Sequence, residues 1–316
     1  MERPQVTVVG SIHVDFFIRV PRLPRPGETV KGHGFLVKPG GKGANQAVGC
    51  GRLGARTYMV GKIGREFREL LLDNFRANGV GTDYIYLDDE VSTGVAFILL
   101  SDDGENMIAF DPGADYKLRP EDVRRAEDAV SGSKVLLTQL EIPLETVDES
   151  LKLAKKHGVL TILNPAPAAP LPASLLGRVD VLTPNRVEAS MLTGIEVSDL
   201  ATATAAVKKL LEAGVGSVVV TMGAEGALVA TREAVYKVPA VKVKPVDTTG
   251  AGDAFNAGLA YGLAKGLPLL EAARLGNVSA ALKVLRVGAQ EGLPRLSELE
   301  EAASRFYQQT QPERVA

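Results

Sequence analysis

The stretch Asp247–Gly258, DTTGAGDAFNAG, places a Gly-Ala-Gly turn at the start of an expected amphipathic helix. The first N–H groups of a helix have no partner inside it, and glycine leaves them open to a ligand. Together with the positive end of the helix dipole, they favour a bound anion such as a phosphate. Asp253 adds a carboxylate to this anion site. It either complements the helix dipole or accepts a proton from a hydroxyl that attacks a phosphate.

Around this stretch, from about Pro120 onward, short apolar runs alternate with segments of helical period. This alternation predicts a parallel sheet covered on both faces, with ligands beyond the carboxyl ends of the strands. The expected strands are Val135–Leu140, Val159–Leu163, Val179–Leu182 and Val218–Thr221. The expected helices are Leu144–Lys156, Leu200–Ala213, Ala251–Lys265, Leu269–Leu285 and Leu296–Gln309.

The first 110 residues differ, because strand signals dominate them. Val6–Val9 is a short buried run typical of a core strand. Further strands are expected at Val14–Val20, Thr93–Leu100 and Asn106–Phe110, the last two joined by the turn sequence SDDGE. The segments Arg22–Lys38 and Asp88–Thr93 are rich in Pro, Gly and charge and are expected to be excursions from the core. No linker is long enough to separate two independent domains, so we expect one α/β core with a small β excursion.

Composition excludes several classes of protein. The 316 residues have a net charge of −2, which provides no basic surface for nucleic acid or anionic lipid. No apolar run reaches the ~18 residues that a membrane helix needs. One cysteine, Cys50, cannot form an internal disulfide, and three histidines make a zinc site improbable. We therefore expect a cytoplasmic protein that contacts neither nucleic acid nor membrane.

Two other glycine-rich segments are weaker signals. Gly49–Gly54 is a literal G-x-G-x-x-G, but it ends a helical stretch and precedes a strand, the reverse of a dinucleotide-binding turn. Small residues for close helix packing explain it better. The segment PGGKGAN at 39–45 lacks the Ser or Thr of a Walker A loop. It is either a tight turn before a helix or a site where Lys42 and Asn45 donate to hydroxyls or an anion.

Taken together, these motifs resemble the ribokinase (PfkB) carbohydrate kinase family. Its two signatures match GGKGANQAVGCGRLGARTYMVGKIG at 40–64 and DTTGAGDAFNAG at 247–258. Between and around them, in the expected order, stand GSIHVD (10–15), PGET (26–29), TQLE (138–141), NPAPA (164–168), TPNRVE (183–188) and GAQ (288–290). The resemblance covers nearly the whole chain.

The resemblance implies a ribokinase-like three-layer α/β sandwich with a small β-sheet lid. It implies a single kinase domain over 1–316, with a core at 1–10, 39–91 and 112–316. The lid strands, within 11–38 and 92–111, would be Ile12–Val20, Val30–Lys38, Thr93–Leu100 and Asn106–Phe110. The implied reaction transfers the γ-phosphoryl group of ATP to the 5-hydroxyl of D-ribose, giving D-ribose 5-phosphate and ADP. The alternatives are a kinase for another sugar or a nucleoside, and a sugar-binding protein without catalysis. The latter is disfavoured because Lys42, Asn185, Glu188 and Asp253 are all present.

Site residues follow from the resemblance, position by position. Asp253 would be the catalytic base, with the N–H groups of Gly250, Ala251 and Gly252 stabilising the charge on the moving phosphoryl group. The sugar would contact His13, Asp15, Gly41, Lys42, Asn45, Glu141 and Asp253. The nucleotide would contact Asn185, Thr221, Gly223, Gly226, Gly252 and Asn277. For Gly223–Gly226 alone, a plain strand-turn-strand is the simpler interpretation.

Cations and partners are implied in the same way. Glu188 would help to hold Mg²⁺ or another divalent cation through water, although Asn185 and Glu188 also fit a capping box. A monovalent-cation site at Asp247, Thr249 and carbonyls near Lys283, Arg286 and Gly288 would make K⁺ an activator. Lids of two chains would clasp to form a homodimer.

This sequence departs from the family pattern at two positions. His13 stands where the family usually has Asn, and imidazole is larger and titrates near pH ~6.5. Gly292 lies where Ser follows the GAQ motif in some relatives.

Overall fold

A computed structural model describes residues 3–316. Its large sheet runs in the order β14-β13-β12-β11-β10-β9-β8-β1-β4-β5. Neighbours from β5 through β11 pair in parallel, and β12, β13 and β14 continue antiparallel. The bounds are β1 Gln5–Val9, β4 Arg56–Ile63, β5 Val80–Leu87, β8 Val135–Thr138, β9 Leu160–Leu163, β10 Val181–Leu182, β11 Ser217–Thr221, β12 Ala227–Ala230, β13 Val235–Val238 and β14 Glu313–Arg314.

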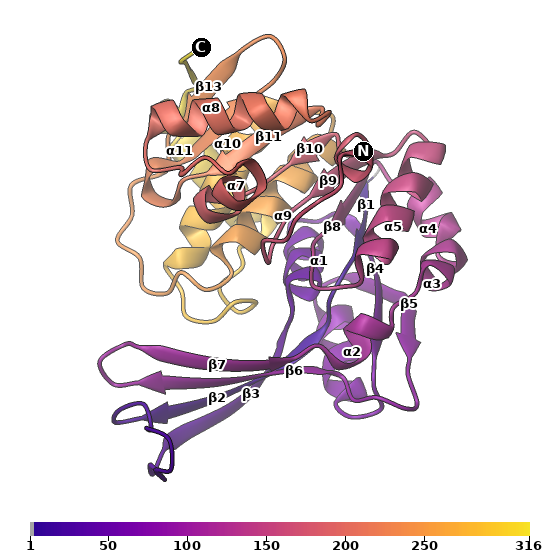
Figure 1. Ribbon diagram of the computed structural model, residues 1–316, viewed down its shortest axis with the longest axis vertical. Coiled ribbons are helices and arrows are strands. Elements are labelled where there is room, and N and C mark those ends of the chain that lie inside the picture. Colours follow the sequence, from indigo (N-terminus) through magenta and orange to yellow (C-terminus); the bar gives the residue numbers. More distant parts are fainter. Residues whose placement is uncertain (1–2) are drawn as a thin grey trace.

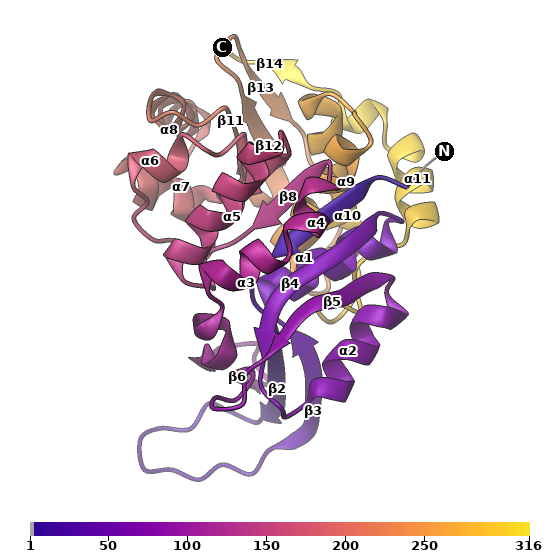
Figure 2. The ribbon, with the colours of Figure 1, turned by 90° about the vertical axis from the view of Figure 1, so that its right-hand side faces the viewer.

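Helices cover both faces of this sheet, on opposite sides of the strands in Figure 2. One layer contains α1 Lys42–Arg52, α2 Arg68–Ala77, α9 Ala251–Ala264, α10 Leu269–Val284 and α11 Leu296–Arg305. The other contains α3 Pro120–Arg125, α4 Glu127–Ser131, α5 Leu144–Lys156, α6 Ala173–Leu176, α7 Arg186–Thr193 and α8 Leu200–Glu212. Single 3₁₀ turns lie at Gly113–Lys117, Gly223–Glu225 and Gln308–Thr310.

Strand periodicity explains the two layers. Successive strand side chains point to opposite faces. In β8, Val135 and Leu137 join one apolar core, whereas Leu136 joins the other. This three-layer arrangement confirms the expected fold class. None of the helices in residues 3–316 has the length and apolarity required to cross a membrane.

A second, four-stranded sheet extends from one end of the large sheet (Figure 1). Its order is β3-β2-β6-β7, with bounds β2 His13–Val20, β3 His33–Gly40, β6 Gly94–Ser101 and β7 Asn106–Asp111. Strand β3 begins later and ends later than expected, because Gly40 pairs with His13 and carries the strand up to the start of α1. Large apolar side chains are exposed on this sheet at Phe35, Leu36, Phe97, Met107, Ile108 and Phe110.

Several elements were not expected from the sequence, among them β5 and α2. Strand β5 forms an edge of the large sheet and most of its side chains are only partly buried, so its apolar pattern is weak.

The close-packing interpretation of Gly49 is confirmed. A Cβ atom at Gly49 would lie 2.5 Å from Cβ of Ala257 in α9, so only glycine lets α1 approach α9 this closely.

Candidate functional site

The candidate site forms where α1 and α9 begin, at the carboxyl ends of β1, β8 and β9. Both helix starts depend on a glycine in the left-handed region, Gly41 with φ 92° and Gly250 with φ 75°. A Cβ atom at Gly41 would lie 2.9 Å from the Ser11 carbonyl oxygen, so the turn also needs the missing side chain. A Cβ atom at Gly252 would meet no atom within 4 Å, which leaves open space beside the first turn of α9.

Asp253 lies at the centre of the site and is 7% exposed. The side-chain amide of Asn45 donates to its Oδ2 at 2.8 Å, and that of Gln46 donates to its Oδ1 at 2.9 Å. Burial raises the pKa of Asp253, while the charge of Lys42 and the two amides act in the opposite direction. A carboxylate oriented by two donors and raised in pKa can accept a proton from a hydroxyl.

A chain of amides orients the partners of Asp253. Gln290 donates to Asn45 Oδ1 at 3.0 Å, and Gln139 donates to Gln46 Oε1 at 2.5 Å. Gln46 also donates to Oδ1 of Asn164 at 3.1 Å. The sequence analysis assigned no role to Gln46, Gln139, Asn164 or Gln290, although each lies inside a motif quoted there. They could have been found in the sequence as polar side chains within apolar or small-residue segments. Such side chains are expected to be buried, and buried amides require hydrogen-bond partners.

The ammonium group of Lys42 faces several carboxylates. Its backbone N–H donates to Glu141 Oε2 at 3.0 Å, and its Nζ lies 3.9 Å from Oε1 of the same carboxylate. Ser11 donates to Glu141 Oε2 at 2.6 Å and holds it in place. Burial lowers the pKa of Lys42, but Asp253, Glu141, Glu188 and Asp15 outweigh this and raise it. Lys42 therefore brings a positive charge to the site at neutral pH.

Asp15 and His13 enter the site from β2. Burial and the nearby carboxylates of Glu141, Glu291 and Asp253 raise the pKa of Asp15 to about 6, against the charge of His13. A Cβ atom at Gly40 would lie 2.3 Å from Asp15 Oδ2, so this glycine makes room for the carboxylate.

The His13 ring is held by Asp115, a residue that the sequence analysis did not single out. His13 Nε2 lies 2.7 Å from Asp115 Oδ2, and the Ile12 N–H donates to Asp115 Oδ1 at 2.8 Å. Burial lowers the pKa of His13, but the adjacent Asp115 carboxylate outweighs burial and raises it. With Nε2 engaged, Nδ1 is the His13 nitrogen left to contact a ligand.

The residues expected to contact a nucleotide gather around α7 and the β11–β12 turn. Asn185 caps α7, and the capping box with Glu188 is complete: each residue donates a backbone N–H to the other's side chain at 2.8 Å. Asn185 also forms a parallel bridge with Thr221 at the end of β11.

The β11–β12 turn is tight, as the simpler interpretation expected. Gly223 and Gly226 have φ 60° and 97°, and a Cβ atom at Gly226 would lie 2.1 Å from the Val238 carbonyl oxygen. The Asn277 amide donates to the same carbonyl at 3.0 Å. Asn277 thus holds the loop after β13 beside this turn.

At the start of α9, one expected anion donor is already engaged. The Ala251 N–H donates to the Thr248 carbonyl at 3.1 Å, because the turn before the helix closes on itself. In this structure the Ala251 N–H is therefore engaged within the turn.

The residues expected to bind a monovalent cation hold a lysine ammonium instead. The side chain of Lys283 is fully buried, and its Nζ donates to the carbonyl oxygens of Asp247 at 2.8 Å and Arg286 at 3.4 Å. The Gly288 and Thr249 N–H groups donate to the Asp247 carboxylate, at 2.8 and 2.9 Å. Burial raises the pKa of Asp247, but these hydrogen bonds outweigh burial and lower it.

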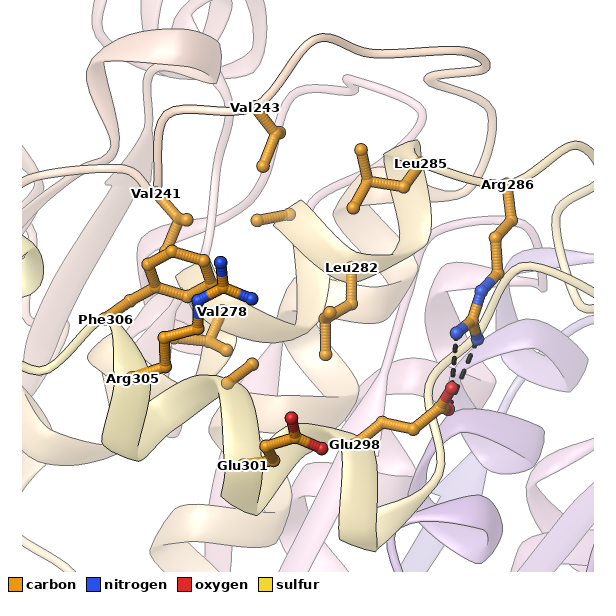
Figure 3. A pocket seen from close by; sticks show the side chains of 12 residues that line it. Val241, Val243, Val278, Leu282, Leu285, Arg286, Glu298, Glu301, Arg305 and Phe306 are labelled. Atoms are coloured by element: carbon orange, nitrogen blue, oxygen red, sulfur yellow. Dashed lines mark hydrogen bonds and ion pairs between the residues drawn. The ribbon is translucent and has the colours of Figure 1, made fainter.

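The side chain of Arg286 turns away from this cluster. Its guanidinium binds the Glu298 carboxylate, with one contact of 3.2 Å, at the edge of an apolar cavity of about 250 Å³ between α10, α11 and Val241–Val243 (Figure 3). None of the residues expected to contact sugar or nucleotide lines this cavity.

Comparisons with known proteins agree with the fold and identify the family. A model of the pfkB family of carbohydrate kinases matches residues 3–296. The chain is 40% identical over 300 residues to a ribokinase of Bacillus subtilis (strain 168), covering 95% of this chain and 99% of that protein. It is 39% identical over 297 residues to a ribokinase of Haemophilus influenzae, covering 94% and 97%. The structure of Arabidopsis thaliana ribokinase complexed with ribose and ATP matches with a TM-score of 0.89 at 32% identity, covering 95% and 99%.

Proposed function

Because this chain belongs to the pfkB family of carbohydrate kinases, we propose that it transfers the γ-phosphoryl group of ATP to the 5-hydroxyl of D-ribose. The products are D-ribose 5-phosphate and ADP. The observation that carries the proposal is the Asp253 carboxylate, buried beside the start of α9 and oriented by Asn45 and Gln46.

In the proposed reaction, Asp253 accepts the proton of the 5-hydroxyl as that oxygen attacks the γ-phosphorus. The bond from the γ-phosphorus to the ADP oxygen breaks, and its electron pair leaves with ADP. The N–H groups of Gly250 and Gly252 stabilise the charge of the moving phosphoryl group, since fixed dipoles need no reorganisation during the reaction. Lys42 adds a positive charge within the same site. Positioning and charge compensation dominate because phosphoryl transfer needs little covalent help.

The sugar binds between α1 and the small sheet. Asp15 and Glu141 accept from its hydroxyls, whereas Lys42, Asn45 and the turn at Gly41 provide donors. Such pairs discriminate strongly, because an analogue without the hydroxyl leaves a buried group unpaired. The chain acts as a single kinase unit, in which the small sheet forms a lid that closes over the sugar.

The nucleotide lies along α7 and the β11–β12 turn, where Asn185, Thr221, Gly223, Gly226 and Asn277 surround it together with Gly252. The divalent-cation expectation fits the donor set. Each of the two Glu188 carboxylate oxygens accepts one hydrogen bond from Asn185, so lone pairs remain for the waters of a hydrated ion. Burial raises the pKa of this carboxyl group. When bound, Mg²⁺ or another divalent cation neutralises phosphate charge. We leave K⁺ out of the reaction, because Lys283 already donates to the carbonyls expected to hold it.

Two chains associate through the lid. This part of the proposal is supported by the exposed apolar side chains of the small sheet, including Ile108 at 58% and Phe35 at 61% exposure. We also infer a cytoplasmic setting, supported by the single cysteine, Cys50, which is buried.

A substrate panel tests the function. Purified protein is given ATP and Mg²⁺ with D-ribose, 2-deoxyribose, fructose, 2-keto-3-deoxygluconate or nucleosides, and the phosphorylated product is identified by mass spectrometry. The highest kcat/KM is expected with D-ribose. A higher value with another sugar or a nucleoside would favour the alternative substrate, for which His13 in place of Asn is the specific reason. No turnover with any of them would reject the kinase.

A further inference from the structure

We infer that the ammonium of Lys283 is a built-in replacement for a monovalent cation, so that catalysis does not depend on K⁺. This inference rests on the proposed function for its catalytic consequence. Its structural part, the presence of the ammonium where a cation was expected, stands independently.

The geometry at Lys283 is that of an occupied cation site. Nζ lies 2.8 Å from the Asp247 carbonyl oxygen, 3.4 Å from that of Arg286 and 3.7 Å from Asp247 Oδ2. An ammonium is a compact point charge with three N–H donors, of which two donate to the carbonyl oxygens, while the Asp247 carboxylate lies within ion-pair distance. A second cation would have to share the same oxygens at short distance from the first, where like charges repel strongly.

The surrounding loop makes room for the lysine. Gly292 stands where some relatives have Ser. A Cβ atom at Gly292 would lie 3.0 Å from Lys283 Cε and 2.9 Å from the Gly288 carbonyl oxygen. A larger residue at 292 would crowd the side chain that brings the ammonium to this position. The inward side chain of Lys283 and the missing side chain at Gly292 are thus structurally coupled.

The ammonium joins two loops that flank the start of α9. Asp247, which it contacts, accepts the Thr249 N–H through one carboxylate oxygen and the Gly288 N–H through the other. Close by, a Cβ atom at Gly250 would lie 3.2 Å from Ala289 Cβ, so the loops pack tightly at the helix start. Lys283 is therefore a positioning residue for the Gly250–Gly252 turn, and it touches no reacting atom.

The first test compares cations on the unmodified protein. The kcat and the KM for ATP and D-ribose are measured in tetramethylammonium chloride and in KCl at equal ionic strength. Values within about twofold are expected. Thermal unfolding without substrates is also expected to give the same Tm in both salts. A saturable K⁺ activation of about tenfold or more, or a saturable rise in Tm with K⁺, would overturn the inference.

The second test removes the ammonium. Lys283→Ala leaves the oxygens without a cation, so kcat is expected to fall about tenfold or more in tetramethylammonium chloride and to recover in K⁺ better than in Li⁺. Its Tm is expected to rise with K⁺, as for any ligand that binds the native state. Lys283→Met fills the space without charge and should lose activity without K⁺ rescue. Lys265→Ala, at an exposed lysine after α9, is the matched control and should match the wild type in both salts.

The outcomes separate the two proposals. If no substrate is phosphorylated, the proposed function fails, and the K⁺-dependent Tm of Lys283→Ala still tests the cation replacement. A Lys283→Ala protein that folds but responds to K⁺ in neither Tm nor rate would reject the replacement. If Lys283→Ala does not fold, the inference is tested by the wild-type kinetics and Tm in the two salts and by the activity of Lys283→Met with and without K⁺.

Discussion

Asn45 Nδ2 donates to Oδ2 of Asp253 across 2.8 Å, although the two residues are 208 positions apart in the chain. The contact joins the first turn of α1 to the first turn of α9. It brings the loop at 39–45, proposed to bind hydroxyls, and the turn at 250–252, proposed to bind phosphate, into one site. Gln46 provides the second donor at 2.9 Å, so both oxygens of the proposed base are oriented.

Replacing Asp253 by Asn should abolish the base and keep the fold. We expect kcat to fall by about 10²–10⁴ while ribose and ATP binding, measured by calorimetry, stay roughly intact. Asp199→Asn is a matched control, because Asp199 is another carboxylate at a helix start and Asn also caps helices. Near-normal turnover in Asp253→Asn would remove Asp253 from the role of base.

Gln46→Met should move the pH dependence of catalysis rather than remove activity. The Gln46 amide lowers the pKa of Asp253, against the larger effect of burial, so its loss raises that pKa further. The acid limb of the kcat–pH profile should shift upward by about one to two units, since a hydrogen bond to a charged group contributes about 1.5–3 kcal/mol. An unshifted acid limb would show that Gln46 does not influence the base.

Ribose affinity should weaken in acid. The pKa of Asp15 is raised to about 6, mainly by burial, and protonation removes an acceptor for a sugar hydroxyl. The Kd for ribose should rise as the pH falls below about 6, and Asp15→Asn should bind more weakly but with less pH dependence. Equal ribose affinity at about pH 5 and about pH 8 in the wild type would contradict this.

The same raised pKa means that the ionised Asp15 carboxylate lowers the stability of the folded protein when no ligand is bound. Above its folded-state pKa the buried carboxylate is charged among other carboxylates, whereas the unfolded chain solvates it. Asp15→Asn should therefore raise the Tm at about pH 8, and this gain should disappear as the pH falls toward about 4. A lower Tm of the variant at the higher pH would contradict this assignment.

The buried His13–Asp115 pair should make stability depend on pH. The pKa of His13 is higher in the folded protein than in the unfolded chain, so protonated His13 stabilises the fold. This contribution to the free energy of unfolding is complete below about pH 6.5 and is lost as the pH rises through the folded-state pKa. The Tm should fall over that range in the wild type and fall less in His13→Asn/Asp115→Asn. His157→Asn breaks a more exposed pair with Glu127 of the same 2.7 Å length, and should behave like the wild type. Parallel Tm curves for all three proteins would reject the effect.

A charge on the small sheet should dissociate the proposed homodimer. Ile108 lies on the edge strand β7 and is 58% exposed, so burying a lysine there in an interface is unfavourable. Light scattering should give twice the chain mass for the wild type and for Leu267→Lys, an exposed apolar position beyond α9. Ile108→Lys should give the monomer mass. A monomeric wild type would reject the lid-mediated dimer.

Local backbone chemistry follows from the sequence alone. The glycines at 41 and 250, the helices after them and the period-2 apolar strands depend on neighbours in the sequence, and each lies within a few residues of the expected place. The family motifs pointed to Asp253 and Lys42 for the same reason, since a phosphate-binding turn is a local feature. Strand β5 was missed because an edge strand carries little apolar pattern.

The contacts between distant segments were decided only by the tertiary structure. Nothing near Asp253 in the sequence points to Gln46, and nothing near His13 points to Asp115, because such partners depend on how the layers pack. Lys283 is the clearest case. Its position suggested a carbonyl ligand for a cation, but whether the side chain turns inward depends on the space that Gly292 leaves. Sequence thus determined the fold and pointed to the proposed reacting groups, whereas packing determined the orientation of these groups, their pKa values and the place of the Lys283 ammonium.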